Sequence, residues 1–133
     1  MMKQAKLLSN AEFKRLTAVI NSIRYSERNH TIVALSFYAG MRACEIAALR
    51  VCDVINSDGK VKDTIYLSAA QTKGSENTTI LVNTKLQKQL YKYLKIHTEL
   101  LEKPNRALIF SAKGAGFSAQ TIVNLFKRLY GLA

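Results

Sequence analysis

Residues 38–53 read YAGMRACEIAALRVCD, and this stretch decides the fold. Its apolar residues suit a buried helix, yet Gly40 and Arg42 interrupt the run. Glycine often ends a helix because it readily adopts the left-handed backbone conformation that other residues avoid. The pattern therefore predicts two helices that separate at Gly40, with Arg42 at the start of the second.

The residues before this glycine predict two further features. Residues 31–39, TIVALSFYA, are apolar nearly all round, which is typical of a helix at the centre of a domain. Ser9 and Glu12 have the spacing of a capping box, and the apolar spacing that follows predicts a helix from about 10 to 22. The polar residues 24–29 predict a break between these two helices.

The residues after the arginine predict a small sheet. Helix formers continue over 43–50, and residues 51–55 then become β-branched and alternating. NSDG at 56–59 is a hairpin signal, and further strands are predicted at 64–70 and 78–82. The predicted fold class is therefore α+β, mostly helical with a small three-stranded antiparallel sheet.

A second capping-box pattern, TKLQ at 84–87, opens a long helix that is predicted to reach about residue 101. Ser118 can cap a last helix that ends near Tyr130. The long helix is amphipathic, with one face of Leu86, Leu90, Leu94, His97 and Leu101 opposite a stripe of Lys85, Lys88, Lys92 and Lys95. We expect the lysine stripe either to track DNA or to form an ordinary solvated face.

Composition narrows the class of protein. The 133 residues predict one domain over 1–133, and the 20 Lys and Arg against nine Asp and Glu give a formal charge of +11. Such a charge favours nucleic acid over other partners. No apolar run approaches the roughly 20 residues that span a bilayer, and the first 16 residues lack the apolar stretch of a signal peptide. We therefore expect a cytoplasmic protein without membrane contact.

The four residues that bind transition metals most readily do not form a ligand pattern. Cys44 and Cys52 show no close metal-ligand spacing with His30 or His97, so no metal site is predicted. Reduced thiols that pack inside the protein are expected instead.

The stretch from Gly40 onward, GMRACEIAALRVCDV, resembles the first motif of the tyrosine recombinase, or phage integrase, family. That motif is roughly T-G-x-R-x-x-E-(hydrophobic)-x-x-L-x-(hydrophobic)-x-D. The matching positions are held by Gly40, Arg42, Glu45, Leu49 and Asp53.

A second resemblance lies in QTKGSENTTILV, where Lys73 matches the lysine that the family carries between its second and third strands. The family often has an arginine five residues after this lysine, and this chain has Thr78 there.

The resemblance implies roles for three of these residues. Arg42 would donate two parallel hydrogen bonds to the scissile phosphate, with Glu45 as a supporting residue that holds the arginine. Lys73 would be the general acid that protonates the leaving 5′ oxygen. Cleavage would store the bond energy in a phosphotyrosine link, so no metal or nucleotide cofactor is implied. The alternatives are that Arg42 pairs with Glu45 near the surface and that Lys73 lies in a solvated turn.

The family also has a later H-x-x-R motif, a second His or Trp, and a nucleophilic tyrosine, and we do not find them here. Neither His30 nor His97 opens an H-x-x-R, and Tyr130 lies in the helix that would precede that motif. The resemblance thus covers the N-terminal two-thirds of a catalytic domain, a truncated core. We expect it to form no covalent intermediate by itself. We also expect an exposed apolar patch on the central and C-terminal helices, and self-association through that patch.

Three functions are compatible with the sequence. The first is a DNA-binding fragment of a site-specific recombinase for DNA integration, with Arg42, Lys73, Lys85 and Lys88 contacting double-stranded DNA. The second is a non-catalytic DNA-binding protein derived from the same fold. The third is an unrelated basic helical domain, for example one that binds RNA.

Overall fold

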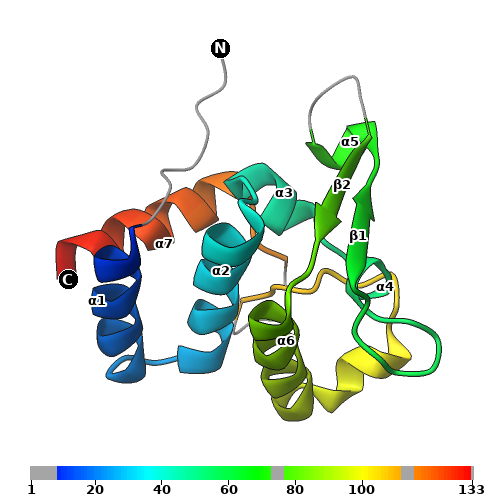
Figure 1. Cartoon of the computed structure of the whole chain (residues 1–133), viewed down its shortest axis with the longest axis horizontal. Helices are drawn as coiled ribbons and strands as arrows, with labels where there is room; N and C mark the ends of the chain where they lie inside the picture. Colours follow the sequence, from blue (N-terminus) through cyan, green and yellow to red (C-terminus); the bar gives the residue numbers. More distant parts are fainter. Residues whose placement is uncertain (1–8, 73–76, 112–115, 133) are drawn as a thin grey trace.

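The computed structural model describes residues 9–72, 77–111 and 116–132. Figure 1 shows α2 between α1 and α6, α7 across the end of the molecule near α1, and a strand pair on the opposite side. The elements in chain order are α1 (Asn10–Asn21), α2 (Ser26–Ala39), α3 (Ala43–Ala48), α4 (Val51–Val54), β1 (Thr64–Leu67), α5 (Ala69–Thr72), β2 (Thr78–Leu81), α6 (Thr84–Ile96), the 3-10 turn η1 (Thr98–Glu102) and α7 (Ala119–Leu132).

Helix α1 begins with the predicted capping box. The Ser9 hydroxyl accepts a hydrogen bond from the Glu12 N–H at 3.1 Å, and the Glu12 carboxylate accepts one from the Ser9 N–H at 3.1 Å. Leu16 and Ile20 point into the core. The prediction of this helix is confirmed.

Helix α2 is the buried central helix, and six successive residues from 31 to 36 are buried. It begins at Ser26, so the predicted polar break over 24–29 is too long. Tyr25 turns the chain with a left-handed φ of 59°, and its carbonyl then accepts the first helical hydrogen bond from the Asn29 N–H. The polar first turn is compatible with burial because the Asn29 side chain bonds to Arg28 and to the Arg24 carbonyl.

The sheet has two strands within the described residues, so the prediction of three is wrong. Strands β1 and β2 are antiparallel, with Ile65 opposite Ile80 and both facing the core. Residues 51–55, predicted as the first strand, instead form α4 followed by a single bridge between Ile55 and Val61. The NSDG turn is present, because the Gly59 N–H donates to the Asn56 carbonyl at 2.9 Å.

The reason for this difference lies far away in the sequence. Residues 104–108 return beside the start of α4 and supply acceptors for its first N–H groups. The Val51 N–H donates to the Arg106 carbonyl at 2.9 Å, and the Cys52 N–H donates to the Pro104 carbonyl at 2.8 Å. Tertiary contacts thus override the β propensity of this stretch.

Helix α6 is shorter than predicted, because the helical pattern changes at His97 into the 3-10 turn η1. The change to a 3-10 turn buries Leu100 and leaves Leu101 48% exposed. A continuous α-helix would instead have placed Leu101 on the buried face, as predicted. The N-cap is Asn83 rather than Thr84, since the Asn83 side chain accepts from the Leu86 N–H at 2.8 Å. Helix α7 begins as predicted, with the Ser118 hydroxyl accepting from the Thr121 N–H at 3.1 Å.

The buried hydroxyl of Tyr93 makes a hydrogen bond whose contribution to stability can be tested. Tyr93 is fully buried on α6, burial raises the pKa of its phenol, and the neutral hydroxyl donates to the Leu108 carbonyl at 2.7 Å. We expect Tyr93→Phe to lower the free energy of unfolding by about 1 to 2 kcal/mol, because the buried carbonyl loses this donor. Urea denaturation measures the change. Tyr66→Phe, at a side chain that is 68% exposed, should leave stability unaltered, and equal losses in the two variants would contradict the expectation.

Candidate active site

Gly40 ends α2 and starts the turn into the arginine helix. Its φ of 65° lies in the left-handed region, and its N–H donates to the Ser36 carbonyl at 3.0 Å. The next N–H, from Met41, reaches back to the Leu35 carbonyl at 3.3 Å. A Cβ on Gly40 would meet no atom within 4 Å, so the backbone conformation rather than space is what favours glycine here.

Arg42 lies at the N-cap of α3, as the sequence predicted. Its backbone N–H donates to the Glu45 carboxylate at 2.8 Å, and that carboxylate is buried. No hydrogen bond or ion pair engages the Arg42 guanidinium within the part of the chain that the structure describes. Glu45 therefore fixes the backbone of Arg42, a half-buried residue, and does not engage its guanidinium.

The same capping contact recurs in the next two helices. The Arg50 N–H donates to the Asp53 carboxylate at 2.9 Å at the start of α4, and the Ser68 N–H donates to the Gln71 side chain at 3.0 Å at the start of α5. In each case the third helical residue binds the backbone of the cap residue. Asp53 thus stabilises the start of α4 through its contact with the Arg50 backbone.

Helix α5 brings the start of the lysine turn close to α3. The Cys44 thiol lies 3.9 Å from the Thr72 carbonyl, and the Gln71 amide donates to the Ala48 carbonyl at 3.0 Å. Lys73, the residue after Thr72, falls outside the described residues. Beyond that gap, the Asn77 side chain accepts from the Ala69 N–H at 3.0 Å, so the two described ends of the turn lie together.

The other predicted DNA contacts lie elsewhere. Lys85 and Lys88 are exposed on the first two turns of α6, the helix that packs along α2. Within the described residues, no hydrogen bond or ion pair joins either lysine to Arg42. Their role in DNA binding stays a prediction.

The two histidines occupy different surroundings. His30 bonds to the Asn21 side chain at 2.7 Å, and burial lowers the pKa of its imidazole. His97, predicted as a core residue, is half-buried at the end of α6 and lies 3.5 Å from Glu99. Within residues 9–72, 77–111 and 116–132, no three metal-binding side chains gather into a possible site.

The expected apolar patch is not on α2 or α7 in the described part of the chain. The exposed large apolar side chains are Tyr25, Tyr66, Leu81, Tyr91, Ile96 and Leu101, which lie on the strands, on α6 and in turns. Contacts with α1 and α3 cover the apolar face of α7. The prediction of a patch on these helices is therefore wrong, and self-association remains untested.

Among the helices that the structure describes, none has the length and apolar character needed to cross a bilayer.

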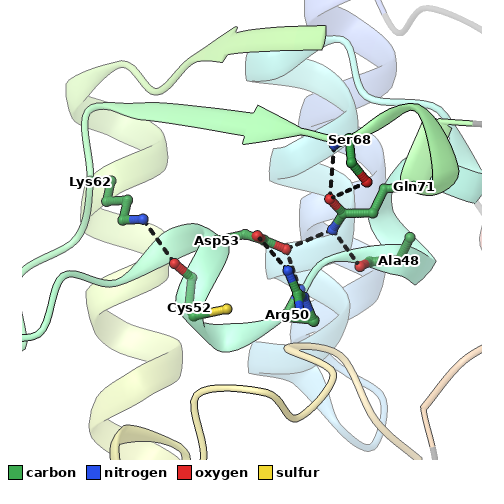
Figure 2. A network of polar contacts seen from close by, with 7 residues as sticks. All are labelled: Ala48, Arg50, Cys52, Asp53, Lys62, Ser68 and Gln71. Atoms are coloured by element: carbon green, nitrogen blue, oxygen red, sulfur yellow. Dashed lines mark hydrogen bonds and ion pairs between the residues drawn. The ribbon is translucent and has the colours of Figure 1, made fainter. Parts of the chain in front are cut away.

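Sequence reasoning missed Gln71. Its side chain joins α5 to α3 and α4 (Figure 2). The predicted strand over 64–70 is wrong beyond Leu67, because residues 69–72 form α5. A signal was present, because Ser68 and Gln71 have the Ser-x-x-Gln spacing of a capping box.

Comparison with known proteins agrees with the geometry. The family model described as "Phage integrase family" matches residues 6–133. The proteins called type 1 fimbriae regulatory protein FimB, from Escherichia coli K12 and O157:H7, are 30% identical over 131 residues, which cover 98% of this chain and 62% of theirs. The chain thus spans less than two-thirds of the length of these relatives.

A solved structure, the XerA recombinase, is similar in fold. It superposes with a TM-score of 0.72 at 23% identity, covering 98% of this chain and 44% of the XerA chain. The likeness to XerA shows the fold, and the family match over nearly the whole sequence shows that the chain belongs to the phage integrase, or tyrosine recombinase, family.

Proposed function

We propose that this chain forms the arginine-bearing part of the catalytic domain of a site-specific recombinase and binds double-stranded DNA there. The observation that carries the proposal is the set of contacts that Arg42 makes. Its backbone is fixed by Gly40 on one side and by Glu45 on the other, while its guanidinium has no partner among the described residues. An arginine held in this way suits a phosphate oxyanion, to which it can donate two parallel hydrogen bonds.

In this role Arg42 would hold the scissile phosphate and stabilise the charge that develops on it during attack. Glu45 would act through the backbone of Arg42, and Lys73 would supply the proton to the leaving 5′ oxygen. Lys85 and Lys88 would contribute phosphate contacts at a distance from the reacting group. The formal charge of +11 supports such binding through release of counterions from DNA.

A non-catalytic DNA-binding role is the second candidate, and the FimB relatives favour it to the extent that they are called regulatory proteins. Both candidates require DNA binding. They differ in whether a covalent link to DNA ever forms in the longer protein to which such a segment would belong.

The polypeptide of 133 residues should bind a duplex of any sequence, with an affinity that falls as the salt concentration rises. Fluorescence anisotropy over a salt series measures this, and a single-stranded RNA of equal charge serves as the comparison. RNA binding that is tighter than duplex DNA binding would contradict the proposal.

Incubation of the polypeptide with a nicked suicide DNA substrate should leave no protein–DNA adduct that survives denaturation. Such an adduct would show that the polypeptide already contains a nucleophile.

A further inference from the structure

Helix α5 is a single turn that cannot be stable alone, because so short a helix does not repay the cost of nucleation. One backbone contact and one side-chain contact instead attach it to α3, the helix that carries Arg42 at its cap. The Thr72 carbonyl meets Cys44 in the first turn of α3, and Gln71 meets Ala48 at the last residue of α3. The one-turn helix therefore contacts α3 near both of its ends.

Gln71 makes the polar contacts in this arrangement, as Figure 2 shows. Its amide nitrogen donates to the Ala48 carbonyl at 3.0 Å and to the Asp53 carboxylate at 2.7 Å. Its amide oxygen accepts from the Ser68 N–H at 3.0 Å and lies 3.2 Å from the Ser68 hydroxyl. One side chain thus joins the start of α5 to the end of α3 and to α4.

A glutamine suits this position because it offers a donor group and an acceptor group at opposite sides of one amide. A glutamate would place an oxygen against the Asp53 carboxylate and the Ala48 carbonyl, both of which are acceptors. The link also reaches a buried acceptor, since Asp53 is only 9% exposed, and contacts with buried charged groups are stronger than contacts at the surface.

The link bears on Arg42 because α3 is only six residues long. The N-terminal end of α3 is fixed by Glu45, and its C-terminal end is fixed partly by Gln71. A short helix that is released at one end can tilt, and a tilt moves the cap residue at the other end. Small displacements of a group that binds a reacting phosphate have large effects on binding and rate.

We propose that Gln71 is a positioning residue for the phosphate site of Arg42, acting through the orientation of α3. The inference rests on the proposed function, in that Arg42 is taken to bind a DNA phosphate. It assigns a role to a residue that neither the family motif nor the charge pattern indicates.

The test is a double-mutant cycle between Gln71 and Arg42 in duplex DNA binding at low salt. Gln71→Met keeps the size of the side chain and removes its hydrogen bonds. We expect it to weaken DNA binding roughly threefold to tenfold with Arg42 present and to have little effect in the Arg42→Ala background. Equal losses in the two backgrounds, or no loss in either, would overturn the proposal.

Gln89→Met is the matched control. Gln89 also joins two elements, since its amide donates to Glu27 at 3.0 Å and to Thr31 at 3.2 Å between α6 and α2. We expect this variant to lose comparable thermal stability and to keep its DNA affinity. A loss of DNA affinity equal to that of Gln71→Met would mean that Gln71 contributes only to general stability.

A measurement without DNA separates this inference from the proposed function. If the wild-type chain binds no duplex, the proposed function fails, and amide hydrogen exchange then decides whether Gln71 holds α3. Gln71→Met should accelerate exchange in residues 46–49 and leave the core of α2 unchanged. Unchanged exchange in residues 46–49 would overturn the positioning role.

Discussion

Arg42→Ala should weaken duplex DNA binding at least about tenfold, because a bidentate contact between guanidinium and phosphate is lost. The fold should be unaffected. The capping contact with Glu45 uses the backbone N–H of residue 42, which the substitution keeps. Arg42→Lys should remain nearer to the alanine variant than to the wild type, because a lysine cannot present two parallel donors.

The measurement is anisotropy at fixed ionic strength, with circular dichroism to confirm the fold of each variant. Arg15→Ala removes the same charge from an exposed position on α1 and serves as the control. Its effect should be small, because one surface charge contributes only to the general attraction of DNA. Equal effects of the Arg15 and Arg42 substitutions would show that net charge alone drives binding.

Asp53→Ala should lower the free energy of unfolding by roughly 2 to 4 kcal/mol. The side chain is buried, and the same oxygen, Oδ2, accepts from the Arg50 N–H at 2.9 Å and from the Gln71 amide at 2.7 Å. Both donors lose this acceptor when the carboxylate is removed, and α4 loses its cap.

Asp53→Asn distinguishes the contribution of these hydrogen bonds to stability from that of the negative charge. An amide oxygen in the place of Oδ2 can accept both hydrogen bonds as neutral contacts, and the variant also loses the 3.7 Å ion pair with Arg50, whose side chain is 48% exposed. We expect a loss of about 1 kcal/mol, because the hydrogen bonds remain and an ion pair that is open to solvent contributes little. Urea denaturation compares the two variants. A loss from Asp53→Asn as large as that from Asp53→Ala would place the stabilisation in the charge instead.

Much of the fold could be predicted wherever a local interaction fixes the chain. Ser9 caps α1 through a residue three positions away, and Gly40 ends α2 through its own left-handed conformation. Arg42 could be placed for the same reason, since it directly follows that turn. In these cases the residues that determine the structure are close together in the sequence.

Prediction was wrong where distant residues determine the structure. Residues 51–55 have β-branched side chains, yet their first N–H groups find acceptors in residues 104–108, and Asp53 caps a helical turn there. Leu101 was placed inside by continuing a helical period through His97, where the backbone changes to a 3-10 turn. No local pattern indicates the acceptors at 104–108 or the change of backbone at His97.

The residues of the candidate site fall into the same two groups, those placed by local interactions and those placed by distant ones. The position of Arg42 at the start of α3 and its contact with Glu45 could be predicted from the spacing, although that contact involves the backbone of Arg42 rather than the guanidinium. The part played by Gln71 depends on where Asp53 and Ala48 lie in space. The spacing from Ser68 to Gln71 could have indicated a helical cap, but it could not have indicated the partners on the other helices.

The pairing of residues 104–108 with the start of α4 has a consequence for the order in which the molecule is made. During synthesis the chain emerges from its N-terminus, and domains generally begin to fold from that end. The first N–H groups of α4 bond to residues that the ribosome adds only after the sheet and α6 are complete. Until then the first two N–H groups of α4 lack these acceptors, so α4 is synthesised before the sheet and α6 but completes its backbone hydrogen bonds after them.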